Sequence, residues 1–131
     1  LYNYKHCNYL YANGERFDMT ETDRYTVFAD SDPVTIELCL SNIPQGTYKI
    51  SETYVNRTHG SSYDQWVSMG GLELTTPYEF DLLKKASSPG FHQKLMHIAS
   101  DETLRLNAEL ELLEIRLIQI TPVICPSDVS R

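Results

Sequence analysis

The sequence predicts a mainly β protein: an antiparallel β-sandwich of about six to eight strands with a short two-helix insertion. Three observations lead to this prediction. Apolar and polar residues alternate along several segments, which is the period of a strand with one buried face. Short polar turns separate these segments, as in antiparallel sheets. The apolar faces are too numerous for one open sheet, so two packed sheets are the simplest arrangement.

In the first half, residues 34–40 alternate strictly and predict a strand. After a turn at 42–47, residues 48–55 return with apolar positions on one face, and we expect these two strands to pair antiparallel. Ahead of them, Leu1 to Tyr4 predicts a short strand, and Asn8 to Phe17 predicts a helical turn.

In the second half, residues 94–98 and 104–110 flank a polar loop of hairpin length. Residues 115–120 are largely apolar on both faces, which predicts a strand buried between layers. Pro122 and Pro126 are expected to end ordered pairing.

The helical insertion, at about 61–88, is predicted from its caps. Ser62 is expected to cap the first helix, because Gln65 follows three residues later, and Gly70-Gly71 ends it. One face of this helix carries Tyr63, Trp66 and Val67.

The second helix has a clearer start and stop. Thr76 is the expected N-cap, with Pro77 at the first helical position and Glu79 completing a capping box. Lys84 and Lys85 in the last turn complement the helix dipole. The expected buried stripe is Phe80, Leu83 and Ala86.

Length, net charge and the distribution of apolar residues limit the functions that this chain can have. The 131 residues form one predicted domain, 1–131, and the opening at Leu1 suggests a fragment of a longer protein. A net charge of -7 disfavours nucleic-acid contact from this chain. Because no apolar run reaches the about 18 residues of a membrane span, we expect no membrane contact.

The titratable residues predict no catalytic or metal site. The three cysteines Cys7, Cys39 and Cys125 lack zinc or disulfide spacing, so we expect no cofactor and a reducing cytoplasm. His92 and His97 lie an odd number of residues apart on a strand and therefore on opposite faces.

A pair of carboxylates could act as a general acid and base, and three Glu residues lie close together in the sequence. Glu109 falls on the face opposite the apolar residues of its strand, and Glu111 and Glu114 lie in a corner. We therefore expect all three to be solvated rather than to form a catalytic pair.

Four segments then point to a family: LYNYKH, GTYKISETYVNRTHGSSYDQWVSMG, TPYEFDLLKKAS and LRLNAELELLEIRLIQI. Together they resemble, in order and over nearly the whole chain, the C-terminal β-sandwich region of glycoside hydrolase family 39, the β-xylosidase family. The characteristic run of that family stands here as His59, Gly60, Tyr63, Trp66, Thr76 and Pro77. The same region resembles the C-terminal end of large AraC-type transcriptional regulators.

The resemblance implies where catalysis does not lie. Family 39 enzymes carry their two catalytic Glu residues on a (β/α)8 barrel, which needs about 250 residues. No catalytic residue therefore carries over. The resemblance implies a non-catalytic accessory domain packed against the parent barrel; the alternative is a sugar-sensing or scaffolding part of an AraC-type regulator.

One constellation remains a candidate ligand or domain-docking surface: His59, Tyr63 and Trp66. Aromatic rings and a polar neighbour suit a carbohydrate, since a sugar ring packs its C–H face on an aromatic. The alternative is that Tyr63 and Trp66 anchor a helix too short to be stable alone. The expected partners are thus the barrel, a carbohydrate and a second copy of the chain.

Overall fold

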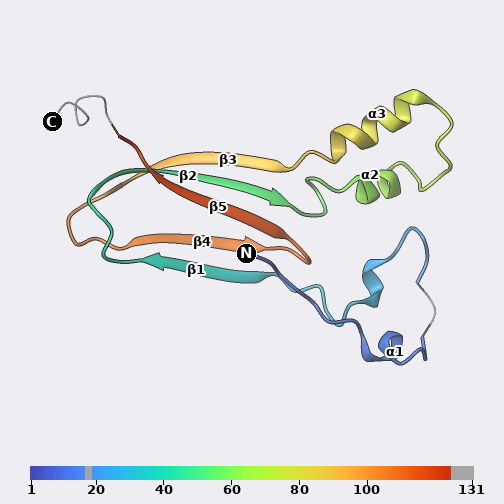
Figure 1. The fold of residues 1–131 in the computed structure, drawn as a ribbon. Helices are drawn as coiled ribbons and strands as arrows, with labels where there is room; N and C mark the ends of the chain where they lie inside the picture. The colour runs from blue at the N-terminus through green and yellow to red at the C-terminus, as the bar shows by residue number, and fades with distance from the viewer. Residues whose placement is uncertain (17–18, 125–131) are drawn as a thin grey trace.

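The computed structural model describes residues 1–16 and 19–124, which form two facing antiparallel sheets (Figure 1). One sheet has the order β1-β4 and the other the order β3-β2-β5. The strands are β1 (Val34–Leu40), β2 (Gly46–Val55), β3 (Gly90–Ile98), β4 (Leu104–Leu110) and β5 (Ile115–Pro122). The predicted antiparallel β-sandwich is confirmed. Cys125 and Pro126 lie outside the described residues.

The predicted pairing of residues 34–40 with residues 48–55 is wrong. β1 pairs with β4, where Leu38 lies opposite Leu106, whereas β2 lies between β3 and β5. The turn after β1 carries the chain from one sheet to the other, so the two apolar faces pack across the layers instead of lying side by side. The loop of hairpin length between β3 and β4 likewise joins strands of different sheets.

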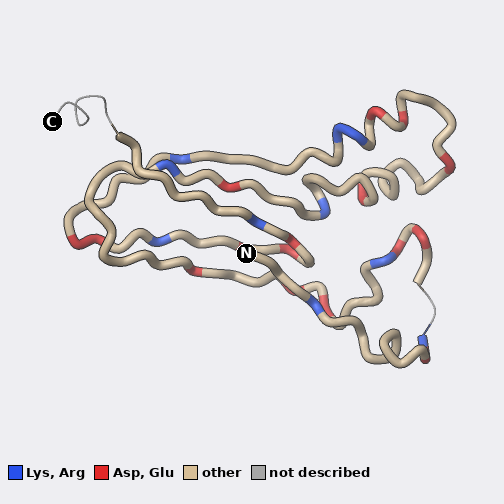
Figure 2. Tube along the Cα trace, viewed as in Figure 1, with Lys and Arg blue, Asp and Glu red and all other residues tan. Residues whose placement is uncertain are grey.

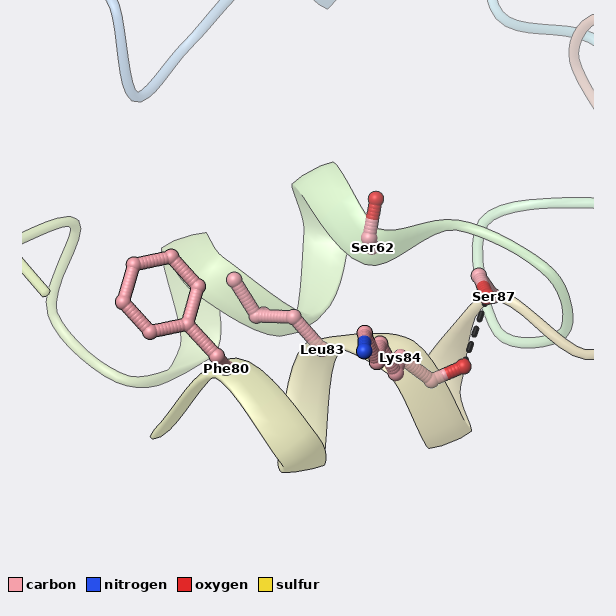
Figure 3. Close-up of a pocket in the computed structure, with 5 residues that line it drawn as sticks. All are labelled: Ser62, Phe80, Leu83, Lys84 and Ser87. Atoms are coloured by element: carbon pink, nitrogen blue, oxygen red, sulfur yellow. Dashed lines mark hydrogen bonds between the residues drawn. The ribbon is translucent and has the colours of Figure 1, made fainter. Parts of the chain in front are cut away.

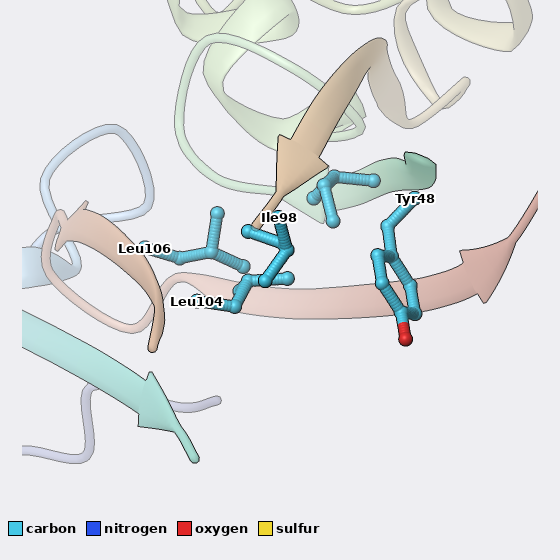
Figure 4. Close-up of a cluster of buried hydrophobic side chains, with 5 residues drawn as sticks. Tyr48, Ile98, Leu104 and Leu106 are labelled. Atoms are coloured by element: carbon cyan, nitrogen blue, oxygen red, sulfur yellow. The ribbon is translucent and has the colours of Figure 1, made fainter. Parts of the chain in front are cut away.

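The core lies between the sheets, as Figure 4 shows. Ile50 from β2 and Leu104 from β4 have no exposed surface, and Ile98 is 2% exposed. Along β4 every second residue is buried, so the predicted alternation is confirmed. Tyr48 completes the cluster and its hydroxyl donates to the carbonyl of Pro44 at 2.7 Å. A satisfied hydroxyl allows the ring to be buried at little cost.

The described residues form five strands, fewer than the six to eight predicted, because Leu1 to Tyr4 makes only an isolated bridge. Tyr2 bridges Ile115, and the Asn3 N–H donates to the carbonyl of Glu114 at 3.0 Å. The Asn3 side chain is buried and donates to the carbonyls of Leu110 and Glu111. This segment therefore extends the edge of β5 without forming a ladder.

The helices lie beyond one end of the sheets (Figure 1). They are α1 (Tyr9–Ala12), the 3-10 helix η1 (Tyr25–Val27), α2 (Ser62–Ser68) and α3 (Pro77–Ala86). Within the described ranges, no helix combines the length and the apolarity that a membrane crossing requires.

The predicted caps of α3 are confirmed, with Glu79 accepting from the backbone N–H of Thr76 at 3.1 Å. The predicted cap of α2 is one residue too late. Ser61, not Ser62, is the N-cap: its hydroxyl accepts from the N–H of Asp64 at 3.2 Å. The helix begins earlier because Asp64 also accepts from the Ser61 hydroxyl, which fixes the turn from both sides.

Two predicted burials are wrong. Phe80 of α3 is 53% exposed, whereas Leu83 and Ala86 are half-buried. Phe80 and Leu83 line a shallow pocket of about 280 Å³ beside Ser62 of α2 (Figure 3), so the insertion has no core of its own. On β5, Ile115 is 56% exposed, because only one face of this strand is covered by the facing sheet.

Candidate functional site

Two of the predicted site residues lie together on α2. The Tyr63 ring lies 6.2 Å from the Trp66 ring and 5.9 Å from the ring of Tyr25 in η1. The Trp66 indole N–H donates to the carbonyl of Leu72 at 2.8 Å, which closes the loop after the helix. Both side chains are half-buried. These contacts match the anchoring alternative raised from the sequence.

The third predicted residue, His59, lies apart from the other two. Its exposed ring contacts Tyr54 of β2 at 5.2 Å between centroids, and its backbone N–H donates to Asn56 at 2.8 Å. Among the described residues, no ring contact joins His59 to Tyr63 or Trp66. The ring contacts therefore join Tyr63 to Trp66 but not to His59.

Asp64 holds α2 against the N-terminal segment. Its carboxylate accepts from the Tyr25 hydroxyl at 2.6 Å, from the Ser61 hydroxyl at 2.6 Å and from Arg57 Nε at 3.1 Å. Burial, followed by the hydrogen bond to Asp64, raises the pKa of Tyr25 to about 12. Arg57 also stacks over the Tyr25 ring at 4.0 Å. The insertion is thus fixed by charged hydrogen bonds in place of a hydrophobic core.

A second polar cluster is buried inside the sandwich and was not predicted from the sequence. Glu114 is 1% exposed, so the expectation that it is solvated is wrong. Arg116 reaches Glu114 Oε2 at 2.9 Å and Glu52 Oε1 at 3.4 Å, and the Asn56 amide donates to Glu114 at 2.8 Å. These partners compensate the desolvation of the carboxylate and draw it inward from the corner.

The alternation of inward and outward positions along the strands indicates this cluster. Glu52 occupies the same face of β2 as Tyr48 and Ile50, and Arg116 the same face of β5 as Ile118. Charges of opposite sign at inward positions of neighbouring strands indicate a buried pair. Because both carboxylates are ion-paired to one guanidinium, the cluster is better suited to holding strands together than to acid–base catalysis.

The histidines are placed as the spacing predicts. His92 contacts Glu52 on the inner face, Nε2 to Oε2 at 2.5 Å, whereas His97 contacts Thr47 on the outer face. In the ranges that the structure describes, no three metal-binding side chains come together. Cys7 and Cys39 are exposed free thiols.

An apolar surface lies on the outer face of the β3-β2-β5 sheet. Directly opposed residues of neighbouring strands share a face, and Thr53 of β2 lies between Phe91 and Leu117. In the next outward position Val55 lies opposite Ile115, which in turn bridges Tyr2. We call these five apolar residues the outer patch: Tyr2, Val55, Phe91, Ile115 and Leu117.

All five side chains of the outer patch are exposed, from 39% for Val55 to 60% for Phe91. The patch is continued by Tyr4, whose ring lies 6.1 Å from that of Tyr2. Figure 2 marks the charged positions along the strands. By register, Lys94 and Arg116 lie on the inner face, and among β2, β3 and β5 the only Asp, Glu, Lys or Arg on the outer face is Lys49, outside the patch. An exposed apolar surface without charges is typical of an interaction site.

No protein-family model matches the sequence, and no curated protein matches it. Solved structures do show the same fold. A GH39 enzyme from Xanthomonas axonopodis pv. citri matches 72% of this chain with a TM-score of 0.59 and 15% identity. A monomeric β-xylosidase from Caulobacter crescentus CB15 matches 83% with a TM-score of 0.63 and 16% identity.

A third structure, a bacterial orthologue of human α-L-iduronidase, matches 78% of this chain with a TM-score of 0.57 and 13% identity. The matched region is 19%, 22% and 19% of the three chains, so this chain spans about a fifth of the length of the enzymes it resembles. At these identities the likeness establishes a shared fold.

Proposed function

We propose that this chain is a non-catalytic accessory β-sandwich of a glycosidase-like protein related to glycoside hydrolase family 39. The observation that carries the proposal is the partial match: most of this chain corresponds to about a fifth of three such enzymes. The sequence segments that resemble the C-terminal region of that family support it independently.

The proposed partner is the barrel domain of the parent chain, and the outer patch is the proposed contact. Phe91, Leu117 and Ile115 are each more than half exposed, and the outer patch to which they belong contains no charged residue. A barrel surface of matching apolar character would remove this area from water at about 25 cal/mol per Å². The mechanism is scaffolding: the sandwich covers and stabilises the domain that holds the catalytic residues.

The proposal is tested by measuring glycosidase activity separately for this chain and for the longer protein. The 131-residue chain alone should not hydrolyse an aryl β-xyloside, whereas the longer protein should hydrolyse it and lose thermal stability when the sandwich is deleted. Hydrolysis by the sandwich alone would overturn the non-catalytic role. A longer reading frame without a barrel carrying two Glu at strand ends would overturn the parentage.

The alternative parent, an AraC-type regulator, stays a prediction from the sequence resemblance, since none of the three similar structures is described as a regulator. A carbohydrate site at His59, Tyr63 and Trp66 also stays a prediction. Titrating xylo-oligosaccharides while following the fluorescence of Trp66, the single tryptophan, tests it directly.

A further inference from the structure

A pocket of about 440 Å³ lies where the N-terminal segment meets α2 and the corner before β5. Six residues give it aromatic or aliphatic walls: Met19, Tyr25, Val27, Phe28, Tyr63 and Leu113. The volume falls in the range of about 300–1,000 Å³ typical of small-molecule sites. Neither the proposed docking contact nor the buried Arg116 cluster involves this pocket.

Arg24 supplies the positive charge of the pocket. Its guanidinium carbon lies 5.5 Å above the centre of the Tyr63 ring, and its side chain is exposed. Within the described residues, no carboxylate lies within salt-bridge distance of Arg24. The nearby acid, Asp64, is already paired with Arg57. The charge of Arg24 is therefore available to an incoming anion.

The other polar groups of the walls are largely engaged. The Tyr25 hydroxyl donates to Asp64 at 2.6 Å, and the Tyr63 hydroxyl accepts from the Arg24 backbone N–H at 3.1 Å. A sugar with many hydroxyls would leave most of them unpaired against such walls. A flat apolar ring with one carboxylate would pack on the tyrosine and phenylalanine rings and pair with the guanidinium.

We propose that the pocket between Tyr25, Phe28 and Tyr63 binds a small aromatic carboxylate, with Arg24 pairing with its carboxylate group. Binding is non-covalent. The ligand class follows from the chemistry of the pocket, which offers one guanidinium and aromatic and aliphatic walls. The site is independent of the proposed docking function, because its lining shares no residue with the outer patch.

The test is calorimetric titration of the 131-residue chain with benzoate and trans-cinnamate, using benzyl alcohol and xylobiose as comparison ligands. We expect saturable binding of the carboxylates and about tenfold weaker binding of benzyl alcohol, in line with the strength of a charged hydrogen bond. Absence of saturable carboxylate binding would overturn the proposal, as would xylobiose binding as tightly as benzoate.

Two variants locate the site. Arg24→Gln should weaken benzoate binding about tenfold and leave benzyl alcohol binding unchanged, since only the charge is lost. Val27→Phe, which fills the pocket, should weaken both. The matched control is Arg16→Gln, because Arg16 also stacks on a tyrosine, Tyr11, but outside the pocket.

Arg24 is exposed, so its replacement should leave the fold intact, and far-UV circular dichroism checks this for every variant. Should Val27→Phe unfold the chain, Arg24→Gln alone decides the matter. Benzoate binding that is unchanged in Arg24→Gln, or reduced equally in Arg16→Gln, would refute the assignment.

Discussion

The outer faces of the two sheets differ in chemistry although they belong to the same sandwich. The face of the β1-β4 sheet carries Glu37, Arg105 and Glu109, all exposed, as expected for a surface in water. The outer face of the β3-β2-β5 sheet carries exposed Phe91 and Leu117, and its only Asp, Glu, Lys or Arg among the strand residues is Lys49. The β1-β4 sheet thus has an outer face typical of a solvated surface, and the β3-β2-β5 sheet has an outer face typical of a contact surface.

The largest expected effect contrasts two Arg–Glu pairs. Arg116→Met leaves Glu114 buried without a cation and should lower the free energy of unfolding by about 3–5 kcal/mol. Arg105→Met removes a similar pair with Glu37 at the surface and should change the free energy of unfolding far less, because water screens an exposed ion pair. Urea unfolding measures the free energy of unfolding of both variants. Equal losses would mean that burial of the Arg116 cluster does not increase its contribution to stability.

A second contrast uses neighbouring residues of β5. Ile118 packs against the core, so Ile118→Ala should cost about 2–3 kcal/mol. Leu117 points outward and is 55% exposed, so Leu117→Ala should change the stability of the isolated domain by less than about 1 kcal/mol. A large loss at Leu117 would show that the outer patch already serves the fold of the domain itself.

The insertion should give an intermediate, pH-dependent effect. Tyr25→Phe removes the hydrogen bond to Asp64 and should cost about 1 kcal/mol at neutral pH. Since folding raises the Tyr25 pKa from 10.0 to about 12, its contribution is complete below pH 10 and is lost as the pH rises through about 12. The difference in the free energy of unfolding between wild type and Tyr25→Phe should therefore be smaller at pH 11 than at pH 8. Tyr78→Phe, at an exposed site, is the control.

The smallest effect concerns Cys39 on the charged face. The hydrogen bond that the Cys39 thiol donates to the Glu37 carboxylate raises the pKa of the thiol above its ordinary value. Because the thiolate is the reactive form, Glu37→Gln should speed alkylation of Cys39 by iodoacetamide at pH 8. Mass spectrometry of the modified peptides gives the rate, with exposed Cys7 as the internal reference. An unchanged rate would contradict the role of Glu37.

Local features of the fold were predictable from the sequence, whereas strand partners were not. The capping box at Thr76 and the alternation in 104–110 are set by residues within a few positions, and both are confirmed. The pairing of β1 with β4 depends on contacts about seventy residues apart in the register, such as Leu38 with Leu106, and no local pattern specifies it.

The candidate site was less predictable for the same reason. Tyr63 and Trp66 were found from their helical spacing, but His59 follows the β2 strand and contacts Tyr54 instead. Glu114 was missed because its burial depends on distant residues: Asn56 donates to it, and Glu52 shares its partner Arg116. The outer patch combines residues of three strands and the N-terminal segment, so it exists only after the sheet has formed.

The most direct test of the docking role measures binding of this domain to the separately produced remainder of the longer protein. Leu117→Lys places a charge in the outer patch, and Asn107→Lys places the same charge on the outer face of the β1-β4 sheet. We predict that wild type and Asn107→Lys bind with equal affinity and that Leu117→Lys binds at least about tenfold more weakly. Equal binding by all three proteins would contradict the outer patch as the contact between the sandwich and its parent.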